Sequence, residues 1–357
     1  MRLAIICSFL NQYGGAERVL EVLHRMYPEA PIYTSVYNPK VFPPEDADWD
    51  VRTSFVNKLP LAKTKPQYYL PLYPWAFESF DLRGYDAVLS ATTSFAHGVI
   101  TSSGTRHVSF CMTPSRFLWN YPAYAEREQI GRLARTVLPI YLQDLRLWDH
   151  AAADRVDHFL AISRTVQRRI QKVYRRDSEI LYPPVQIGSL QAPQTPDDYY
   201  LVVSRLVPYK RIDLAVQAFN QLGWPLLVVG EGRDKAKLQA MARSNVRFMG
   251  YVSDDEKRQL MARCRAFIFP GEDDFGLTPI EALAMGRPVV AYAAGGALDT
   301  IVEGVSGVYF REATPESLAD AVRRIAGMEF NALSLQQYAL RFDEHVFEEG
   351  MRRVLGA

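Results

Sequence analysis

At 357 residues the chain is long enough for two domains, each with a hydrophobic core of ordinary size. Its 41 basic and 40 acidic side chains give a formal net charge of +1, which argues against nucleic acid as a partner. Cys7, Cys111 and Cys264 are odd in number and lie far apart in apolar runs, a pattern that predicts buried thiols in a reducing, cytoplasmic compartment. No apolar run has the roughly 18 residues that cross a bilayer, so any membrane contact is expected to be peripheral, on the inner face of the membrane.

Short apolar runs alternate along the chain with segments of helical periodicity. In the first half we expect strands at residues 2–9, 86–91, 107–111 and 158–162. The proline-rich stretch that follows Pro183-Pro184 and runs through 192–196 is the predicted domain boundary. Strands follow at 199–204, 226–229, 246–249, 266–269 and 288–291, and one helix carries Ile212, Ala215, Val216, Phe219 and Leu222 on a single face. The alternation predicts an α/β protein of two doubly wound domains, whose strand carboxyl ends face a central cleft.

The most specific segment runs from Phe269 to Glu281, where a strand ends in acids and glycine and a helix follows. Thr278 as N-cap, Pro279 at the first helical position and Glu281 behind them form a predicted capping box. The main-chain amides of Gly276, Leu277 and Thr278 would then point at an anion such as a diphosphate.

Two acids of this segment are predicted to bind the ligand. Asp273 and Glu281 are placed to hold hydroxyls of a sugar and of a ribose. The alternative is that Glu281 only caps the helix and the acids only solubilise a loop.

Two cations follow the strand at 199–204. Arg205 and Lys210 bracket a turn that contains Pro208, and we expect their heads to converge on one diphosphate. There they would neutralise a departing nucleoside diphosphate, which is the main electrostatic task in breaking a glycosyl phosphate bond. The alternative is that both are solvated cations at a helix start.

A glycine pair, Gly14-Gly15, lies between the first strand and the first helix. Without side chains these residues let the main chain approach a ligand closely, and a helix amino end follows. The spacing is not GxGxxG, so a dinucleotide fingerprint is absent. The alternative is an ordinary tight turn between strand and helix.

Taken together, these motifs resemble the signature set of retaining glycosyltransferase family 4. The motifs are Gly14-Gly15-Ala16-Glu17, Ser204-Arg205-Leu206 with Lys210, Asp273 to Glu281, and Gly295-Gly296, in this order over nearly the whole chain. Residues 111–119, 147–149 and 182–185 are similar to bacterial mannosyltransferases of O-antigen and capsule assembly. The resemblance implies the GT-B fold, with two Rossmann-like domains. Residues 1–188 would form the acceptor-side domain and 196–330 the donor-binding domain, with 331–357 packing back on the first.

The resemblance also implies an activity. The protein would be a hexosyltransferase that moves a sugar, with mannose from GDP-mannose favoured, onto a hydroxyl of a glycan or lipid-linked acceptor. Arg205 and Lys210 would bind the donor diphosphate, Asp273 the transferred sugar and Glu281 the ribose. Gly14 and Gly15 would lie near the diphosphate and the acceptor. No metal or other cofactor is expected, because lysine, arginine and main-chain amides supply the positive charge.

Two positions depart from the family pattern. The family usually has glutamate at Asp273, one methylene longer. It usually has histidine at Met112, and methionine cannot donate the corresponding hydrogen bond. His97 follows the preceding strand and is predicted to substitute in part as a catalytic residue, although a loop histidine is more often structural.

Two basic stretches bear on the acceptor. One is the helix with Arg164, Arg168, Arg169, Lys172, Arg175 and Arg176, and the other carries Arg52, Lys58, Lys63 and Lys65 beside the aromatic residues 68–75. Such patches suit anionic lipid heads or a lipid diphosphate, whereas a solvated surface is the alternative.

Two other function classes stay open at this stage. One is a sugar-nucleotide-binding or regulatory subunit without turnover. The other is an epimerase or phosphorylase of the same fold.

Overall fold

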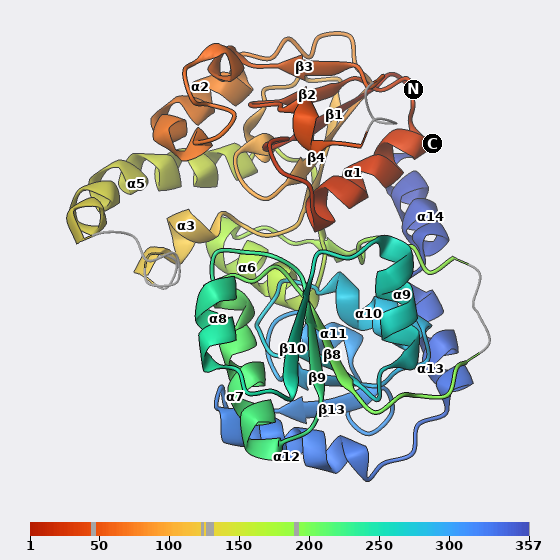
Figure 1. Ribbon diagram of the computed structural model, residues 1–357. Helices are drawn as coiled ribbons and strands as arrows, with labels where there is room; N and C mark the ends of the chain where they lie inside the picture. The colour runs from red at the N-terminus through yellow and green to blue at the C-terminus, as the bar shows by residue number, and fades with distance from the viewer. Residues whose placement is uncertain (44–47, 123–124, 126–131, 189–192, 357) are drawn as a thin grey trace. The chain divides into compact units, whose positions relative to one another are not determined.

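The computed structural model describes residues 1–43, 48–122, 125, 132–188 and 193–356. The chain divides into two compact units (Figure 1). Unit 1 comprises Met1–Pro183 and Phe347–Ala357, and unit 2 comprises Pro184–Val346. The division falls between Pro183 and Pro184, where the predicted boundary stretch begins, and residues 189–192 of that stretch lie outside the described residues. Within the described residues, no helix is both long and apolar enough to span a membrane.

Unit 1 is built on a seven-stranded parallel sheet in the order β3-β2-β1-β4-β5-β6-β7. Its strands are β1 (Leu3–Cys7), β2 (Ile32–Thr34), β3 (Val51–Thr53), β4 (Ala87–Thr92), β5 (Arg106–Cys111), β6 (His158–Ala161) and β7 (Glu179–Ile180). Its α-helices are α1 (Gly15–Met26), α2 (Tyr73–Glu78), α3 (Arg116–Trp119), α5 (Arg132–Ala153), α6 (Arg164–Tyr174) and most of α14 (Glu344–Leu355). Short 3-10 helices connect them at η1 (Pro39–Val41), η3 (Phe55–Lys58), η4 (Pro66–Leu72) and η5 (Ala96–Gly98). Every residue of β1 and β4 is buried, as expected for central strands covered on both faces.

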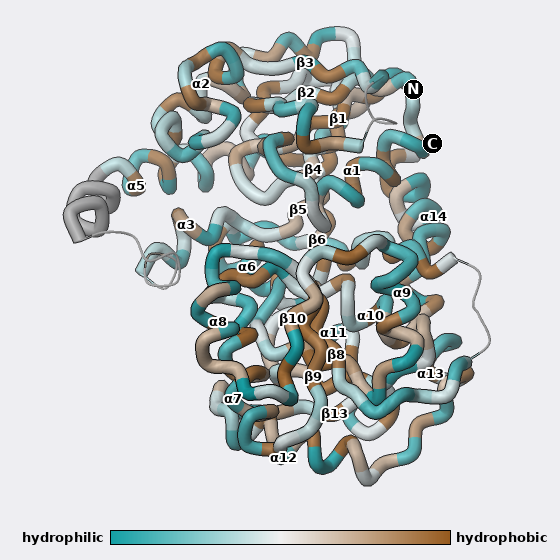
Figure 2. The backbone as a smooth tube through the Cα atoms, viewed as in Figure 1, coloured by the Kyte–Doolittle hydropathy of each residue, from teal (hydrophilic) through white to brown (hydrophobic). Residues whose placement is uncertain are grey.

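Unit 2 has a six-stranded parallel sheet in the order β10-β9-β8-β11-β12-β13. Its strands are β8 (Tyr200–Val203), β9 (Leu226–Val229), β10 (Val246–Gly250), β11 (Phe267–Phe269), β12 (Val289–Tyr292) and β13 (Gly307–Phe310). The helices are α7 (Ile212–Leu222), α8 (Lys235–Met241), α9 (Asp254–Arg263), α10 (Leu277–Ala284), α11 (Ala297–Thr300), α12 (Pro315–Ala326) and α13 (Ala332–Ala339), with 3-10 helices η6 (Pro208–Lys210) and η7 (Leu340–Phe342). Helices α7 and α12 pack together, and α10 packs with α9 and α13 (Figure 1). Figure 2 shows hydrophobic residues along β8 and β9, inside these helices.

Most predicted elements are confirmed. Each of the nine expected strand positions contains a strand, and the expected helix is α7, with Ile212, Ala215, Val216 and Phe219 buried. The three cysteines are free and buried, also as expected. Strands β2, β3, β7 and β13 were not predicted. Strands β3 and β7 include the charged residues Arg52 and Glu179, so neither stands out as a continuous apolar run.

The end of the chain is shared between the two units. Helix α13 packs on α10 within unit 2, and only Phe347–Ala357 groups with unit 1. There the ring of Phe347 packs edge-on against Phe110 of β5, with centroids 5.4 Å apart. Arg353 also forms an ion pair with Glu179 of β7.

Candidate functional site

The carboxyl ends of β8 and β11 form the topological switch point of unit 2. These strands are neighbours in the sheet, but the chain leaves β8 toward β9 and leaves β11 toward β12, in the opposite direction. In open parallel sheets ligands bind at this position, because the two loops diverge there. The loop after β8 carries Arg205 and Lys210, and the loop after β11 carries Asp273. The topology therefore brings the predicted cations and the predicted acid to one edge of the sheet.

Lys210 and Asp273 form an ion pair between these two loops. The Lys210 ammonium donates to Oδ2 of Asp273, and the side chains are only 17% and 22% exposed. Gly271 makes the approach possible, because a Cβ at this position would lie 2.8 Å from the main-chain oxygen of Lys210. Any other residue at 271 would push the loops apart. The pair is thus fixed by backbone packing as well as by charge.

Arg205 and Lys210 are connected through Tyr209. The Arg205 guanidinium donates to the Tyr209 hydroxyl over 2.6 Å, and the Lys210 ammonium lies 5.3 Å from the centre of the Tyr209 ring. Arg205 itself is exposed. Tyr209 was not predicted, since a single tyrosine in a turn gives no signal by itself.

Helix α10 begins earlier than predicted. It starts at Leu277, with Gly276 as N-cap and no side-chain capping bond, so the capping box with Thr278 as N-cap was wrong. Gly276 has φ +87°, and a Cβ there would lie 2.8 Å from the ring of Phe269. Both facts require glycine and explain why the helix begins after it. The amides of Leu277 and Thr278 are in the first turn, as the anion-binding prediction needs, although Pro279 has no amide hydrogen to contribute.

Glu281 makes a contact that the sequence analysis missed. Its Oε2 lies 3.2 Å from the ammonium of Lys257, which is on α9 and also pairs with Oδ1 of Asp254 at 3.0 Å. The side chains of Glu281 and Lys257 are 16% and 13% exposed. The carboxylate is therefore held by an interhelical ion pair instead of capping its own helix. A lysine 24 positions upstream gives no sequence signal for such a contact.

The loop that contains Gly295 and Gly296 packs against the loop that carries Asp273. The Gly296 amide donates to the main-chain oxygen of Asp273 over 2.8 Å. A Cβ at 295 would lie 2.1 Å from that oxygen, and a Cβ at 296 would lie 2.2 Å from Cα of Phe275. Only glycines allow this approach, which holds the Gly295-Gly296 loop against the Asp273 loop.

Gly14 and Gly15 stand where β1 of unit 1 gives way to α1. The helix begins at Gly15, and Gly14 is its N-cap without a side-chain capping bond. The φ of Gly14 is −170°, an extended conformation that any residue adopts, and a Cβ there would meet Oε2 of Glu17 only at 3.6 Å. Neither strain nor crowding within the chain accounts for this glycine. Its predicted role of leaving room for a ligand stays a prediction.

His97 lies inside unit 1. Its side chain is 1% exposed, and Nε2 is 3.2 Å from the main-chain oxygen of Asp149 and 3.5 Å from its Oδ1. Asp149 also accepts from Nε1 of Trp119 at 2.6 Å and from the hydroxyl of Tyr174 at 2.9 Å. Burial and the Asp149 carboxyl raise the pKa of Tyr174 well above its usual value. A ring enclosed in this network has no face for a sugar, which favours the structural alternative for His97.

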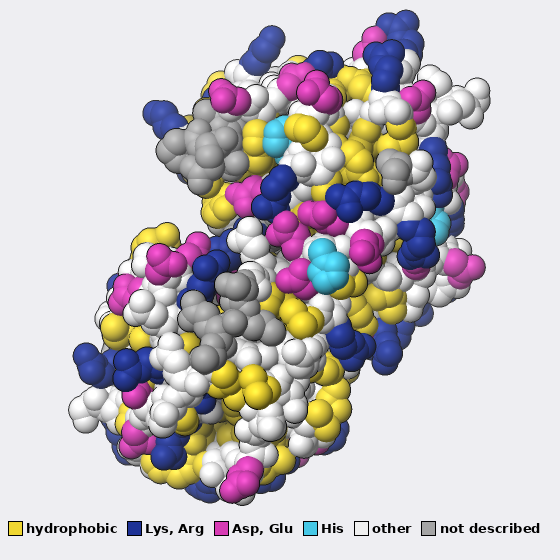
Figure 3. Space-filling model, turned by 90° about the vertical axis from the view of Figure 1, so that its right-hand side faces the viewer, with side chains coloured by type: hydrophobic (Ala, Val, Ile, Leu, Met, Phe, Trp, Pro, Cys, Tyr) yellow, Lys and Arg dark blue, Asp and Glu magenta, His cyan; other side chains and the backbone are white. Residues whose placement is uncertain are grey.

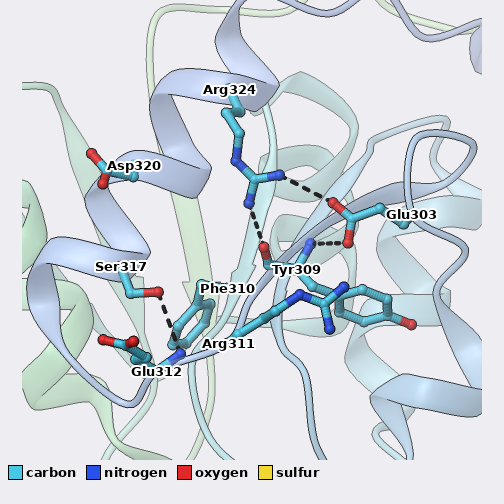
Figure 4. A pocket seen from close by; sticks show the side chains of 8 residues that line it. All are labelled: Glu303, Tyr309, Phe310, Arg311, Glu312, Ser317, Asp320 and Arg324. Atoms are coloured by element: carbon cyan, nitrogen blue, oxygen red, sulfur yellow. Dashed lines mark hydrogen bonds and ion pairs between the residues drawn. The ribbon is translucent and has the colours of Figure 1, made fainter.

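A surface pocket of about 460 Å³ lies beside β13 and α12 (Figure 4). The Arg324 guanidinium donates to the main-chain oxygen of Tyr309 and lies 3.2 Å from Oε1 of Glu303, whose Oε2 accepts from the Tyr309 amide. Because β13 is the edge strand of its sheet, these side chains satisfy main-chain groups that have no neighbouring strand. The pocket is explained by protection of that edge, and we do not assign it to the site.

Two parallel sheets of this order in one chain, with a charged switch point in the second, define the GT-B fold. Solved structures confirm the fold. The chain matches the crystal structure of Anabaena HepE in complex with UDP-glucose with a TM-score of 0.72 and 18% identity, covering 100% of both chains.

Residues 190–341, which lie within unit 2, match the family model described as glycosyl transferases group 1. Glycogen synthase of Pseudomonas aeruginosa is 36% identical over 134 residues, which are 35% of this chain and 26% of the relative. The O-antigen chain mannosyltransferase RfbU of Salmonella typhimurium is 26% identical over 203 residues, which are 53% and 56% of the two chains. The chain thus spans less than two thirds of the length of these relatives.

Proposed function

We propose that the protein is a retaining glycosyltransferase that moves a hexose from a nucleoside diphosphate sugar to a hydroxyl acceptor. The observation that carries this proposal is the Lys210–Asp273 ion pair at the switch point of unit 2, beside the start of α10. An ammonium and a carboxylate held together there suit a diphosphate and the sugar attached to it. The family match of the segment that contains both residues supports the same activity.

The proposed reaction depends on stabilising negative charge on the leaving diphosphate. As the bond between the anomeric carbon and the diphosphate oxygen breaks, negative charge grows on the leaving diphosphate. Lys210, Arg205 and the first amides of α10 stabilise that charge. The acceptor oxygen bonds to the anomeric carbon on the same face, and its proton passes to the departing diphosphate oxygen. Asp273 orients both the ammonium and a sugar hydroxyl.

A finer proposal concerns which nucleoside diphosphate sugar is the donor. RfbU is named a mannosyltransferase, which supports mannose and therefore GDP-mannose, whereas the HepE structure holds UDP-glucose. We propose GDP-mannose as the first donor, and a glycan or lipid-linked hydroxyl as acceptor. A thermal-shift panel of GDP, UDP and ADP with their sugars tests the choice. The nucleotide that raises the midpoint of unfolding most identifies the donor.

Replacement of Arg205 by alanine tests the mechanism. We expect transfer to fall at least about a hundredfold, because one preorganised charge at the leaving group is lost. The rate of nucleoside diphosphate release in the presence of acceptor is the measurement. Arg247→Ala, an exposed arginine on β10, is the matched control and should retain the wild-type rate. Full activity of Arg205→Ala would refute the role of Arg205.

A second candidate is a binding subunit without turnover. Met112 stands where the resemblance implies histidine, and its side chain, 9% exposed, has no hydrogen to donate. Calorimetry with nucleotide sugars, paired with an acceptor screen, separates the two candidates. Binding without turnover on any acceptor would favour the subunit. A changed nucleotide sugar formed without acceptor would instead indicate an epimerase.

A further inference from the structure

Residues 51–77 of unit 1 contain four cations and no acid. Arg52 is neutralised by Asp50, at 2.7 Å. Lys58, Lys63 and Lys65 are exposed, and none of them forms an ion pair with a carboxylate within the described parts of the chain. Figure 3 shows one face of the molecule, on which basic and acidic side chains are interspersed. This segment therefore carries a local positive charge on a nearly neutral protein.

Buried side chains and two tyrosine hydrogen bonds hold residues 51–77 against the core of unit 1. Val56, Tyr73 and Phe77 are completely buried in the core of unit 1. The Tyr69 hydroxyl donates to the main-chain oxygen of Pro60 at 2.6 Å, and the Tyr73 hydroxyl to that of Pro66 at 2.8 Å. These contacts fix the loop 60–66 onto η4 and α2.

The segment also has exposed side chains. We call six of them the lysine–aromatic surface: Lys58, Leu61, Lys63, Lys65, Tyr68 and Trp75. Leu61, Tyr68 and Trp75 are 59%, 60% and 68% exposed, and the Lys65 ammonium lies 5.5 Å from the centre of the Tyr68 ring.

Leu61 has a backbone conformation that leucine rarely adopts. Its φ is +58°, in the left-handed region that glycine and asparagine adopt more readily than leucine. Its main-chain oxygen accepts from the amides of Thr64 and Lys65, which closes the turn. Neither backbone preference nor burial accounts for a leucine at the tip of a turn flanked by lysines. An apolar environment outside the protein does account for it.

We propose that the lysine–aromatic surface docks unit 1 onto an anionic lipid bilayer. Leu61 enters the acyl boundary, Tyr68 and Trp75 lie at the level of the headgroups, and the three lysines meet the lipid phosphates. The complementarity of charge selects this occupant, because a neutral glycan would have no use for three unpaired ammonium groups. The inference is independent of the transferase activity and concerns only where the protein binds.

Vesicle co-sedimentation of the full chain tests the proposal. The probes are phosphatidylcholine vesicles with and without phosphatidylglycerol. We expect binding only to the anionic vesicles, and binding should weaken with salt. Replacement of Lys58, Lys63 and Lys65 by glutamine should weaken it on the order of a hundredfold, since each lysine near an anionic surface contributes roughly fivefold. The matched control replaces the exposed residues Lys237, Arg247 and Arg258 by glutamine, which removes the same charge and should leave binding unchanged.

Leu61→Asn separates docking from a structural role. Asparagine accepts the left-handed conformation, so the variant should unfold no earlier than the wild type, yet bind vesicles at least about fivefold more weakly. Failure of the wild-type chain to bind anionic vesicles would overturn the proposal. So would equal binding by the lysine variant, or equal losses in both triple variants. None of these outcomes bears on donor binding.

Discussion

Among single residues, His107 on β5 couples stability to pH. Its side chain is fully buried, with Nε2 3.0 Å from the hydroxyl of Ser90. Burial, with smaller effects of His97 and Arg155, lowers its pKa to about 3. An unfolded histidine titrates near 6.5. Below that pH the unfolded state therefore binds the extra proton, and the stability that neutral His107 provides above pH 6.5 is lost as pH falls.

This coupling predicts how steeply the free energy of unfolding depends on pH. Between pH 6.5 and pH 5 the free energy of unfolding should fall by about 2 kcal/mol through this residue. In His107→Gln that contribution disappears, so its unfolding free energy should depend less on pH than that of the wild type. Urea denaturation at pH 7 and pH 5 measures the difference, with the exposed His150→Gln as control. Parallel pH dependences for His107→Gln and wild type would exclude the effect.

The roles of single residues were predictable where a charged residue directly follows a strand of a parallel sheet. Arg205, Lys210 and Asp273 follow strands, and parallel topology necessarily brings strand ends to one edge. The enclosure of His97 depends on Asp149, far along the chain, and a loop histidine looks the same in sequence whether open or closed. Tyr209 and Lys257 were missed for the same reason, since their contacts are set by the packing of loops and helices.

At the scale of elements, the contact between α9 and α10 supports the donor site. Lys257 is a positioning residue, because it holds the carboxylate of Glu281, proposed to bind the ribose. Lys257→Met should weaken nucleoside diphosphate binding about tenfold, which is ~1.4 kcal/mol. Binding of inorganic pyrophosphate should stay unchanged, since its partners would be Arg205 and Lys210. Lys257→Arg should restore part of the affinity.

Calorimetry with both ligands checks this role, with Lys237→Met on the exposed face of α8 as control. Wild-type nucleotide affinity in Lys257→Met would remove Lys257 from the site. Equal losses for nucleotide and pyrophosphate would point instead to a general disturbance of unit 2.

The helices were predicted correctly only where the local sequence pattern, and no tertiary contact, determines them. The buried face of α7 repeats at helical spacing, and four of the five residues predicted for it are buried, while Leu222 is partly buried. The start of α10 was not predicted, because Thr278-Pro279 is a strong local signal for a helix start. The structure begins the helix at Leu277 instead, where Gly276 adopts φ +87° against Phe269. A tertiary contact thus overrides the local preference.

At the scale of the whole molecule, unit 2 is continuous and unit 1 is not. The two ends of unit 2 meet, because the Val185 amide donates to the main-chain oxygen of Phe342 at 3.0 Å. Phe342 also packs against Phe275 in the Asp273 loop, with ring centroids 5.8 Å apart. Residues 1–183 alone would lack α14, whose Phe347 covers Phe110. Sequence repetition predicted two domains, but such closure contacts between distant segments leave no pattern in the sequence.

Residues 184–346 should therefore fold as a separate protein and bind the same nucleoside diphosphate as the full chain. Arg205, Lys210, Asp273, Lys257 and Glu281 all belong to this unit, which also has its own sheet and core. We expect one cooperative urea transition and an affinity within about tenfold of that of the full chain, since the proposed phosphate and ribose contacts are retained. Calorimetry gives the affinity, and Lys210→Met in the same fragment is the control that should lose it. A fragment that folds cooperatively but binds no nucleoside diphosphate would mean that the donor site needs residues from unit 1, with Gly14 and Gly15 as the first candidates.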